Sequence, residues 1–162
     1  MLRWLWLSAV VITADQASKI AAERLLSLHE QVAVIPGFFN FTLAYNEGAA
    51  FSFLSNAGGW QRWFFTALAI GVSAILIVWL KRLKPGDWQP ALALALIIGG
   101  ALGNLIDRMA YGHVIDFIQW YYRDWYWPSF NIADSAISVG AAILILTALL
   151  GHDEAASPSE SS

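Results

Sequence analysis

The sequence of 162 residues has no cysteine, only five prolines and few charged side chains. Without cysteine the chain forms no disulfide, binds no metal through a thiolate and has no cysteine nucleophile. Charged residues make up 13% of the sequence and apolar residues 58%, whereas soluble proteins contain roughly 25% charged residues. This composition favours a membrane as the solvent. No basic patch is present, which argues against a nucleic-acid partner.

The motifs of several peptidase classes are missing as well. The sequence contains no HExxH zinc motif, no GxSG-type serine motif and no GxGD motif. Lys19 is a candidate activator of a serine, but Asp15 lies one helical turn away and favours the charged form of the lysine, which is the wrong state for a base. Carboxylates remain as the candidates for hydrolytic chemistry.

The apolar residues gather into four stretches, each near the roughly 20 residues that a helix needs to cross a bilayer. The first stretch is too long, and too interrupted by Asp15 and Lys19, for a cleaved signal peptide, so we expect it to be retained. The sequence predicts an all-α membrane protein with one membrane-embedded domain over residues 1–151 and a disordered tail over 152–162. The predicted transmembrane helices cover about residues 2–22, 63–80, 91–108 and 132–151.

The orientation follows from basic residues beside the short loops. The loop between the second and third predicted helices carries Lys81, Arg82 and Lys84, which favours the cytoplasmic side. Both termini and the tail are then cytoplasmic, and the two longer connections lie on the outer face. Other basic residues lie near that outer face and weaken the count: Lys19, Arg24, Arg62, Arg108 and Arg123.

The first outer connection has a pattern typical of strands. Residues 32–35 and 38–45 are β-branched or aromatic in large part, and Pro36 and Gly37 lie between them. We expect a small extracytoplasmic β-sheet between the first and second helices, within about residues 30–58. Its aromatic content suggests that it lies on the membrane surface.

Several polar residues fall inside or beside the predicted helices. A charge within a span costs roughly 2.5 to 3.5 kcal/mol on insertion scales, so it needs a partner or a function. Asp15 and Lys19 are four residues apart and can pair on one helix face. A structural ion pair and direct contact with substrate are equally open for them. Asn104 lies deeper and needs hydrogen bonds from the backbone, a neighbouring helix or a substrate.

Other features have simpler explanations. Gly99 and Gly103 form a small-xxx-small pattern, which indicates close helix packing. Asp107 and Arg108 fit ordinary interfacial residues, and His113 follows a glycine in a turn, where an exposed loop residue is expected.

Two aspartates are the strongest candidates for catalysis. Asp116 lies within the apolar run 114–118, where a solvated charge is out of place, and Asp134 lies near the start of the fourth predicted helix. Asp134 also fits a structural role, because Asn131 can cap that helix and an acid in the first turn suits the helix dipole. We expect antiparallel third and fourth helices to bring the aspartates together at their outer ends.

Such a pair has the chemistry of an aspartic peptidase. Two carboxylates about 4 Å apart repel by roughly 4 kcal/mol at an effective dielectric of about 20, so one keeps its proton near neutral pH. The ionised member then deprotonates water, while the protonated member polarises the scissile carbonyl and protonates the leaving amine. A small transporter or proton relay is the alternative, in which Asp15, Asp116 and Asp134 carry ions through the membrane depth. A structural membrane subunit is a third possibility.

Five motifs in order carry a resemblance to a known family. Their sequence resembles that of bacterial lipoprotein signal peptidase, or signal peptidase II. The motifs are DQASK at 15–19, NEGAAFS at 46–52, GALGNLIDR at 100–108, VIDF at 114–117 and FNIAD at 130–134.

The resemblance implies a four-helix aspartyl endopeptidase of the bacterial cytoplasmic (inner) membrane, with its active site near the outer face. Such an enzyme removes signal peptides from prolipoproteins, cutting N-terminal to the diacylglyceryl-modified cysteine, and needs no metal or organic cofactor. Its partners are then lipid-modified prolipoproteins and membrane lipid, and we expect a monomer. Asp116 and Asp134 match the family's catalytic pair. The positions expected to bind substrate or support the pair are Asp15, Lys19, Asn46, Asn104, Arg108, Asn131 and Ala133.

Overall fold

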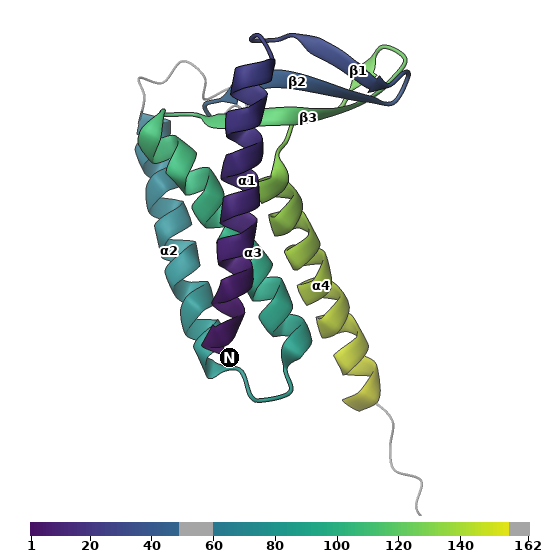
Figure 1. Cartoon of the computed structure of the whole chain (residues 1–162). Helices are drawn as coiled ribbons and strands as arrows, with labels where there is room; N and C mark the ends of the chain where they lie inside the picture. The colour runs from purple at the N-terminus through teal and green to yellow at the C-terminus, as the bar shows by residue number, and fades with distance from the viewer. Residues whose placement is uncertain (49–59, 156–162) are drawn as a thin grey trace, which may run out of the picture.

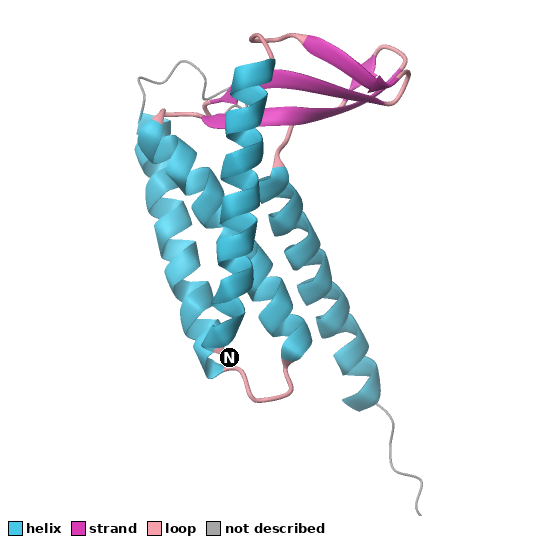
Figure 2. Cartoon of the chain, viewed as in Figure 1, coloured by secondary structure: helices cyan, strands magenta, loops and turns pink. Residues whose placement is uncertain are grey.

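The computed structural model describes residues 1–48 and 60–155. A bundle of helices is covered at one end by a β-sheet, and the N-terminus lies at the other end (Figures 1 and 2). In chain order the elements are the short 3₁₀ helix η1 (Leu2–Trp4), α1 (Leu5–Leu25), β1 (Gln31–Ile35), β2 (Phe39–Asn46), α2 (Trp60–Arg82), α3 (Trp88–Ala110), β3 (Val114–Tyr122), β4 (Trp125–Tyr126) and α4 (Ile132–Ala155).

Among the described residues, three helices are long and apolar enough to cross a membrane: Arg62–Arg82, Trp88–Ala110 and Ile132–Leu150. The fourth, α1, has 21 residues but carries Asp15 and Lys19 in its interior. The helix bounds differ from the predicted ones by a few residues. In particular, residues 152–155 continue α4, because a helix can extend past its last apolar residue. The rest of the predicted tail, residues 156–162, lies outside the described residues.

The centre of the bundle is α3, which packs against α1, α2 and α4. Small residues bring the helix axes close together, as the sequence pattern predicted for Gly99 and Gly103. A Cβ added at Gly99 would lie 3.0 Å from the backbone of Ser8, and one added at Gly100 would collide with the carbonyl oxygen of Ala133. These contacts bring α1 and the first turn of α4 against the same part of α3.

The sheet is antiparallel, with the strand order β1-β2-β3-β4. The two strands predicted between the first and second helices are confirmed as β1 and β2, but the sheet is larger than predicted, because β3 and β4 come from the connection between α3 and α4. In β3, Asp116 pairs with Ala44 of β2, 72 positions earlier in the chain. The run 114–122 is rich in β-branched and aromatic residues, but its pairing depends on this distant partner. Residues 49–58 of the predicted β-rich segment lie outside the described residues.

The chain returns from β4 to α4 along the edge of β3. Phe130 forms an isolated antiparallel bridge with Ile118. The N–H of Phe130 donates to the carbonyl oxygen of Ile118 at 2.9 Å, and the N–H of Ile118 donates back to Phe130 at the same distance. The bridge fixes the start of α4 beside the strand that carries Asp116.

Candidate active site

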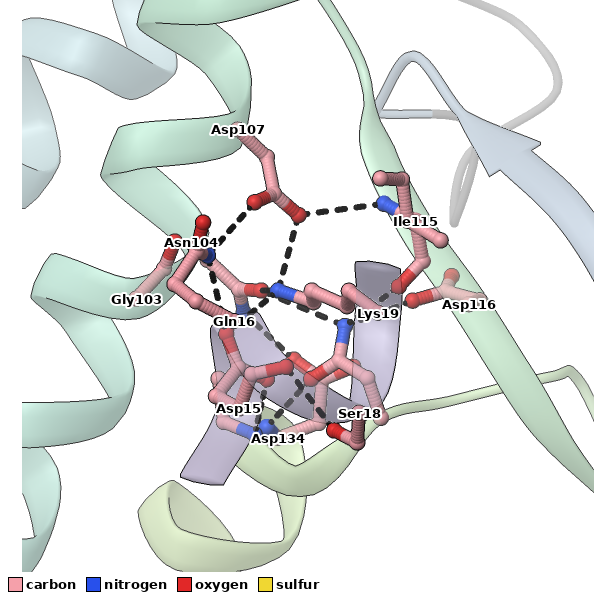
Figure 3. Close-up of polar contacts among 12 residues, drawn as sticks. Asp15, Gln16, Ser18, Lys19, Gly103, Asn104, Asp107, Ile115, Asp116 and Asp134 are labelled. Atoms are coloured by element: carbon pink, nitrogen blue, oxygen red, sulfur yellow. Dashed lines mark hydrogen bonds and ion pairs between the residues drawn. The ribbon is translucent and has the colours of Figure 1, made fainter. Parts of the chain in front are cut away.

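The two candidate catalytic aspartates come from different kinds of element. Asp116 lies on β3 and is 2% exposed, whereas Asp134 lies in the first turn of α4 and is partly buried. The expectation that both lie at the outer ends of helices is wrong for Asp116, because residues 114–122 form a strand that leaves the bundle. The bridge between Ile118 and Phe130 nevertheless places the two aspartates in one cluster of polar side chains (Figure 3).

Two asparagines link the carboxyl groups. Asn131 Nδ2 donates to Asp116 Oδ1 at 2.7 Å, and Asn104 Nδ2 donates to Asp134 Oδ1 at 2.7 Å. Asn131 Nδ2 also lies 3.2 Å from Asn104 Oδ1, so the amides are bonded to each other. A continuous path of side-chain hydrogen bonds therefore joins the two aspartates.

Asn131 also caps α4. Asn131 Oδ1 accepts a hydrogen bond from the backbone N–H of Asp134 at 2.9 Å, which is the capping contact that the sequence predicted. Helix capping and a place in the aspartate cluster are therefore not alternatives for this region, because Asn131 makes both contacts.

The carboxyl group of Asp116 has two amide donors. Besides Asn131, Asn46 Nδ2 donates to its Oδ2 at 3.0 Å, and Asn46 Oδ1 accepts from the N–H of Gly48 at 2.9 Å. Burial and the nearby charge of Asp134 raise the pKa of Asp116 from its ordinary value of 3.8 to about 7, while these two hydrogen bonds oppose the rise. A carboxyl group with this pKa exchanges its proton near neutral pH, which suits general acid–base catalysis.

An ion-pair centre lies beside the aspartates. Lys19 Nζ lies 2.7 Å from Asp15 Oδ2, 2.8 Å from Asp107 Oδ2 and 3.0 Å from Asn104 Oδ1. The ammonium group has three donors, and each has one of these acceptors. The pairing of Asp15 with Lys19 is confirmed. Because Lys19 is 1% exposed and its donors are used within the protein, the structural ion pair is favoured over contact with substrate.

Two members of this centre were not among the predicted site residues. The sequence predicts an ordinary interfacial residue at Asp107, but this side chain is fully buried, and its Oδ2 accepts a hydrogen bond from the N–H of Ile115 at 3.2 Å. Gln16 Nε2 donates to Asp107 Oδ1 at 2.8 Å. The available signal was spacing: Asn104 and Asp107 are three residues apart in one helix and so share a face.

The remaining predicted residues lie around the same cluster. The backbone N–H of Ala133 donates to Asp15 Oδ1 at 2.9 Å. Arg108 Nη1 donates to the carbonyl oxygen of Asn104 at 3.3 Å, and its guanidinium lies 5.3 Å from the ring centroid of Phe65. The structure therefore brings together all nine residues that the sequence predicted. His113 is half-buried rather than exposed, because its ring packs against Tyr45 with centroids 4.2 Å apart.

A cavity of about 360 Å³ adjoins Asp134. The other residues that line it are Trp120, Trp127, Phe130, Ser135, Ser138 and Val139. It gives the partly buried carboxyl group a space in which another molecule can approach. Within residues 1–48 and 60–155, no group of three or more His, Cys, Asp or Glu side chains is placed to hold a metal ion.

A bundle of apolar helices in which two asparagines link two aspartates has the features expected of a membrane peptidase of the aspartic type. The signal peptidase II family model matches residues 7–150. The chain therefore belongs to the signal peptidase II family.

Individual relatives agree with the family model. The chain is 59% identical to a lipoprotein signal peptidase of Pseudomonas fluorescens, over 90% of this chain and 86% of the relative. It is 61% identical to one from Xanthomonas campestris, over 86% of this chain and 83% of the relative. A solved structure described as a bacterial membrane enzyme matches with a TM-score of 0.84 and 30% identity, covering 100% of this chain and 96% of that one.

Proposed function

We propose that Asp116 and Asp134 are the catalytic pair with which this chain, a membrane aspartic endopeptidase, removes signal peptides from prolipoproteins. The observation that carries the proposal is the hydrogen-bonded path from Asp116 through Asn131 and Asn104 to Asp134. It holds two carboxyl groups from a strand and a helix in a fixed relation, as a shared proton-transfer site requires.

The acid and base roles of the two aspartates follow from the surroundings of each carboxyl group. Asp116 is the more deeply buried, and burial raises its pKa to about 7, so it can hold and release a proton near neutral pH and acts as the acid. Asp134 borders the cavity and lies at the N-terminus of α4, where the helix dipole favours a carboxylate. It removes a proton from water, whose oxygen attacks the scissile carbonyl. Asp116 polarises that carbonyl and gives its proton to the leaving amine, and the proton on Asp134 then restores the pair.

The substrate is a prolipoprotein cut just before a diacylglyceryl-modified cysteine. A substrate with an apolar signal helix and acyl chains is already dissolved in the bilayer, so it can reach Asp134 from the membrane. The cavity of about 360 Å³ beside Asp134 supports this route, since aromatic rings and two serines line it. A lipid-modified prolipoprotein and membrane lipid are then the partners, and the chain acts as a monomer.

All four long helices span the membrane in this proposal, within one domain over residues 1–151. Helix α1 has 21 residues, about 32 Å at 1.5 Å per residue, which suffices for a hydrocarbon core of roughly 30 Å. Its charged residues Asp15 and Lys19 are at most 1% exposed and so do not face lipid. The last turn of α2, which contains Lys81, and the loop to α3, which contains Lys84, lie at the end opposite the sheet (Figure 1). The termini are then cytoplasmic, and the sheet and active site lie at the outer face of the inner membrane.

The test is cleavage of a diacylglyceryl-modified prolipoprotein by the purified protein in detergent. Asp116→Asn and Asp134→Asn should each abolish cleavage while the melting temperature shows a folded protein. Asp124→Asn is the matched control, because Asp124 is exposed in the turn between β3 and β4, and it should retain full activity. Full activity in either variant of the pair would remove that aspartate from catalysis. An unlipidated precursor cut as fast as the lipidated one would contradict the substrate assignment.

A further inference from the structure

The residue before each candidate catalytic aspartate has its backbone N–H held by a buried carboxylate. Ile115 precedes Asp116, and its N–H donates to Asp107 Oδ2 at 3.2 Å. Ala133 precedes Asp134, and its N–H donates to Asp15 Oδ1 at 2.9 Å. The second donor is in the first turn of α4, where backbone N–H groups have no partner within the helix. Two separate chain segments are thus fixed in the same way, one residue from the reacting group.

One lysine joins the two carboxylates. Lys19 Nζ lies 2.7 Å from Asp15 and 2.8 Å from Asp107, and all three side chains are at most 1% exposed. Gln16 makes a second connection, since its Nε2 lies 2.8 Å from Asp107 Oδ1 and 3.3 Å from Asp15 Oδ2. Figure 3 shows these side chains converging between α1 and α3. Solvent screens buried charges at such distances very little, so the attraction that holds these three side chains together remains strong.

We propose that Asp15, Lys19 and Asp107 form a positioning triad that sets the separation and orientation of Asp116 and Asp134. The inference rests on the proposed function, because it assigns the triad to the same pair. The path of contacts runs from Ile115 through Asp107, Lys19 and Asp15 to Ala133. Each end of this path is a backbone group next to a catalytic residue, so a displacement within the triad moves one aspartate relative to the other.

Stability alone does not account for this arrangement. A buried ion pair is often no more stabilising than apolar side chains of the same volume. Apolar side chains, however, would leave the N–H groups of Ile115 and Ala133 without these acceptors. The triad therefore supplies hydrogen-bond acceptors for these two N–H groups, which a well-packed apolar contact between α1 and α3 would not supply.

The first experiment compares Asp107→Asn and Asp15→Asn with the control Asp124→Asn, using the full chain in detergent and a diacylglyceryl-modified prolipoprotein. Asparagine keeps the size and one acceptor oxygen but loses the charge that holds Lys19. We expect kcat of each triad variant to fall roughly 10- to 100-fold, since a displacement of about 1 Å can cost 100-fold. KM should stay within about twofold of the original value, because the triad does not contact substrate. Asp124→Asn should match the original protein in both constants.

A second variant guards against loss of folding. The variant Lys19→Met with Asp15→Asn and Asp107→Asn removes all three charges of the triad, so no buried charge is left without a partner. This triple variant removes the ion pairs that connect Asp107 to Asp15. It should melt as one cooperative unit and still show the reduced kcat, with the control Lys81→Met unaffected because Lys81 is exposed.

A double-mutant cycle separates positioning from independent structural support. Asp15→Asn and Asp107→Asn act through the same lysine, so their effects on kcat should be strongly non-additive. Additive effects, a change in KM alone, or an original kcat in the folded variants would overturn the proposal, and so would unfolding of every triad variant including the triple one. The proposed function is judged separately: it fails only if Asp116→Asn or Asp134→Asn still cleaves, or the original protein does not.

Discussion

Asn131 Nδ2 lies 2.7 Å from Asp116 Oδ1, so the residue that caps α4 also holds the carboxyl group of a strand. One side chain thus both caps a helix of the bundle and binds a carboxyl group of the polar cluster. The two roles use different atoms, because Oδ1 accepts the N–H of Asp134 and Nδ2 donates to Asp116. They can therefore be separated by substitution.

Replacing Asn131 with serine or alanine should separate them. Asn131→Ala removes the cap and should lower stability by about 1 kcal/mol or more. Asn131→Ser restores a good capping residue but is too short to reach Asp116, so stability should recover while cleavage stays at least about tenfold reduced. Thermal melting and cleavage rates of both variants measure this. Original activity in Asn131→Ser would show that the contact with Asp116 is dispensable.

The stability of the protein should depend on pH through Asp116. Folding raises the pKa of this carboxyl group from 3.8 to about 7, so the folded state binds the proton more tightly. This stabilisation is complete below about pH 4 and is lost as the pH rises to about 7 and beyond. Asp116→Asn has no such proton. Between pH 4 and 7 its melting temperature should therefore rise relative to that of the original protein. Asp124→Asn is the control, and an equal pH dependence in Asp116→Asn and the original protein would contradict the prediction.

The pH dependence of cleavage should move when Asn46 is changed. If Asp116 is the acid, kcat falls as the pH rises through about 7. The hydrogen bond from Asn46 lowers the pKa of Asp116, so Asn46→Ala should raise it and shift the decline of kcat to higher pH. A hydrogen bond of about 1 kcal/mol corresponds to a shift of roughly 0.7 pH units. Rates measured from pH 5 to 9 decide the point, and a shift to lower pH would contradict the assignment.

Helix packing at Gly100 can be tested with a matched glycine. A Cβ at Gly100 would collide with the carbonyl oxygen of Ala133, whereas one at Gly71 in α2 has open space within 4 Å. Gly100→Ala should therefore destabilise the protein by about 1 to 3 kcal/mol. Gly71→Ala should be neutral or stabilising by up to about 1 kcal/mol, since alanine favours the helix. Melting temperatures in one detergent measure both, and equal melting temperatures would show that α4 can move away from α3.

The sequence predicted what depends on local pattern. Apolar stretches located the long helices, the spacing of Asp15 and Lys19 predicted their ion pair, and Asn131 was recognised as a cap. It missed what depends on distant partners. Residues 114–122 become a strand only through pairing with β2, so the place of Asp116 on a sheet was not predicted. The place of Asp107 in the polar cluster was not predicted for the same reason, because its backbone partner Ile115 is on that strand.

The bridge between Ile118 and Phe130 closes residues 119–129 into a loop with both ends fixed. Changes in length at its turn, residues 123–124, leave the spacing between Asp116 and Asn131 untouched, whereas Trp120 and Trp127 line the cavity beside Asp134. An extra residue between Val114 and Asp116 would instead turn Asp116 to the opposite side of the sheet, because side chains alternate along a strand. The chain thus combines a turn that tolerates changes in length with a short strand segment whose length sets the direction of a candidate catalytic side chain.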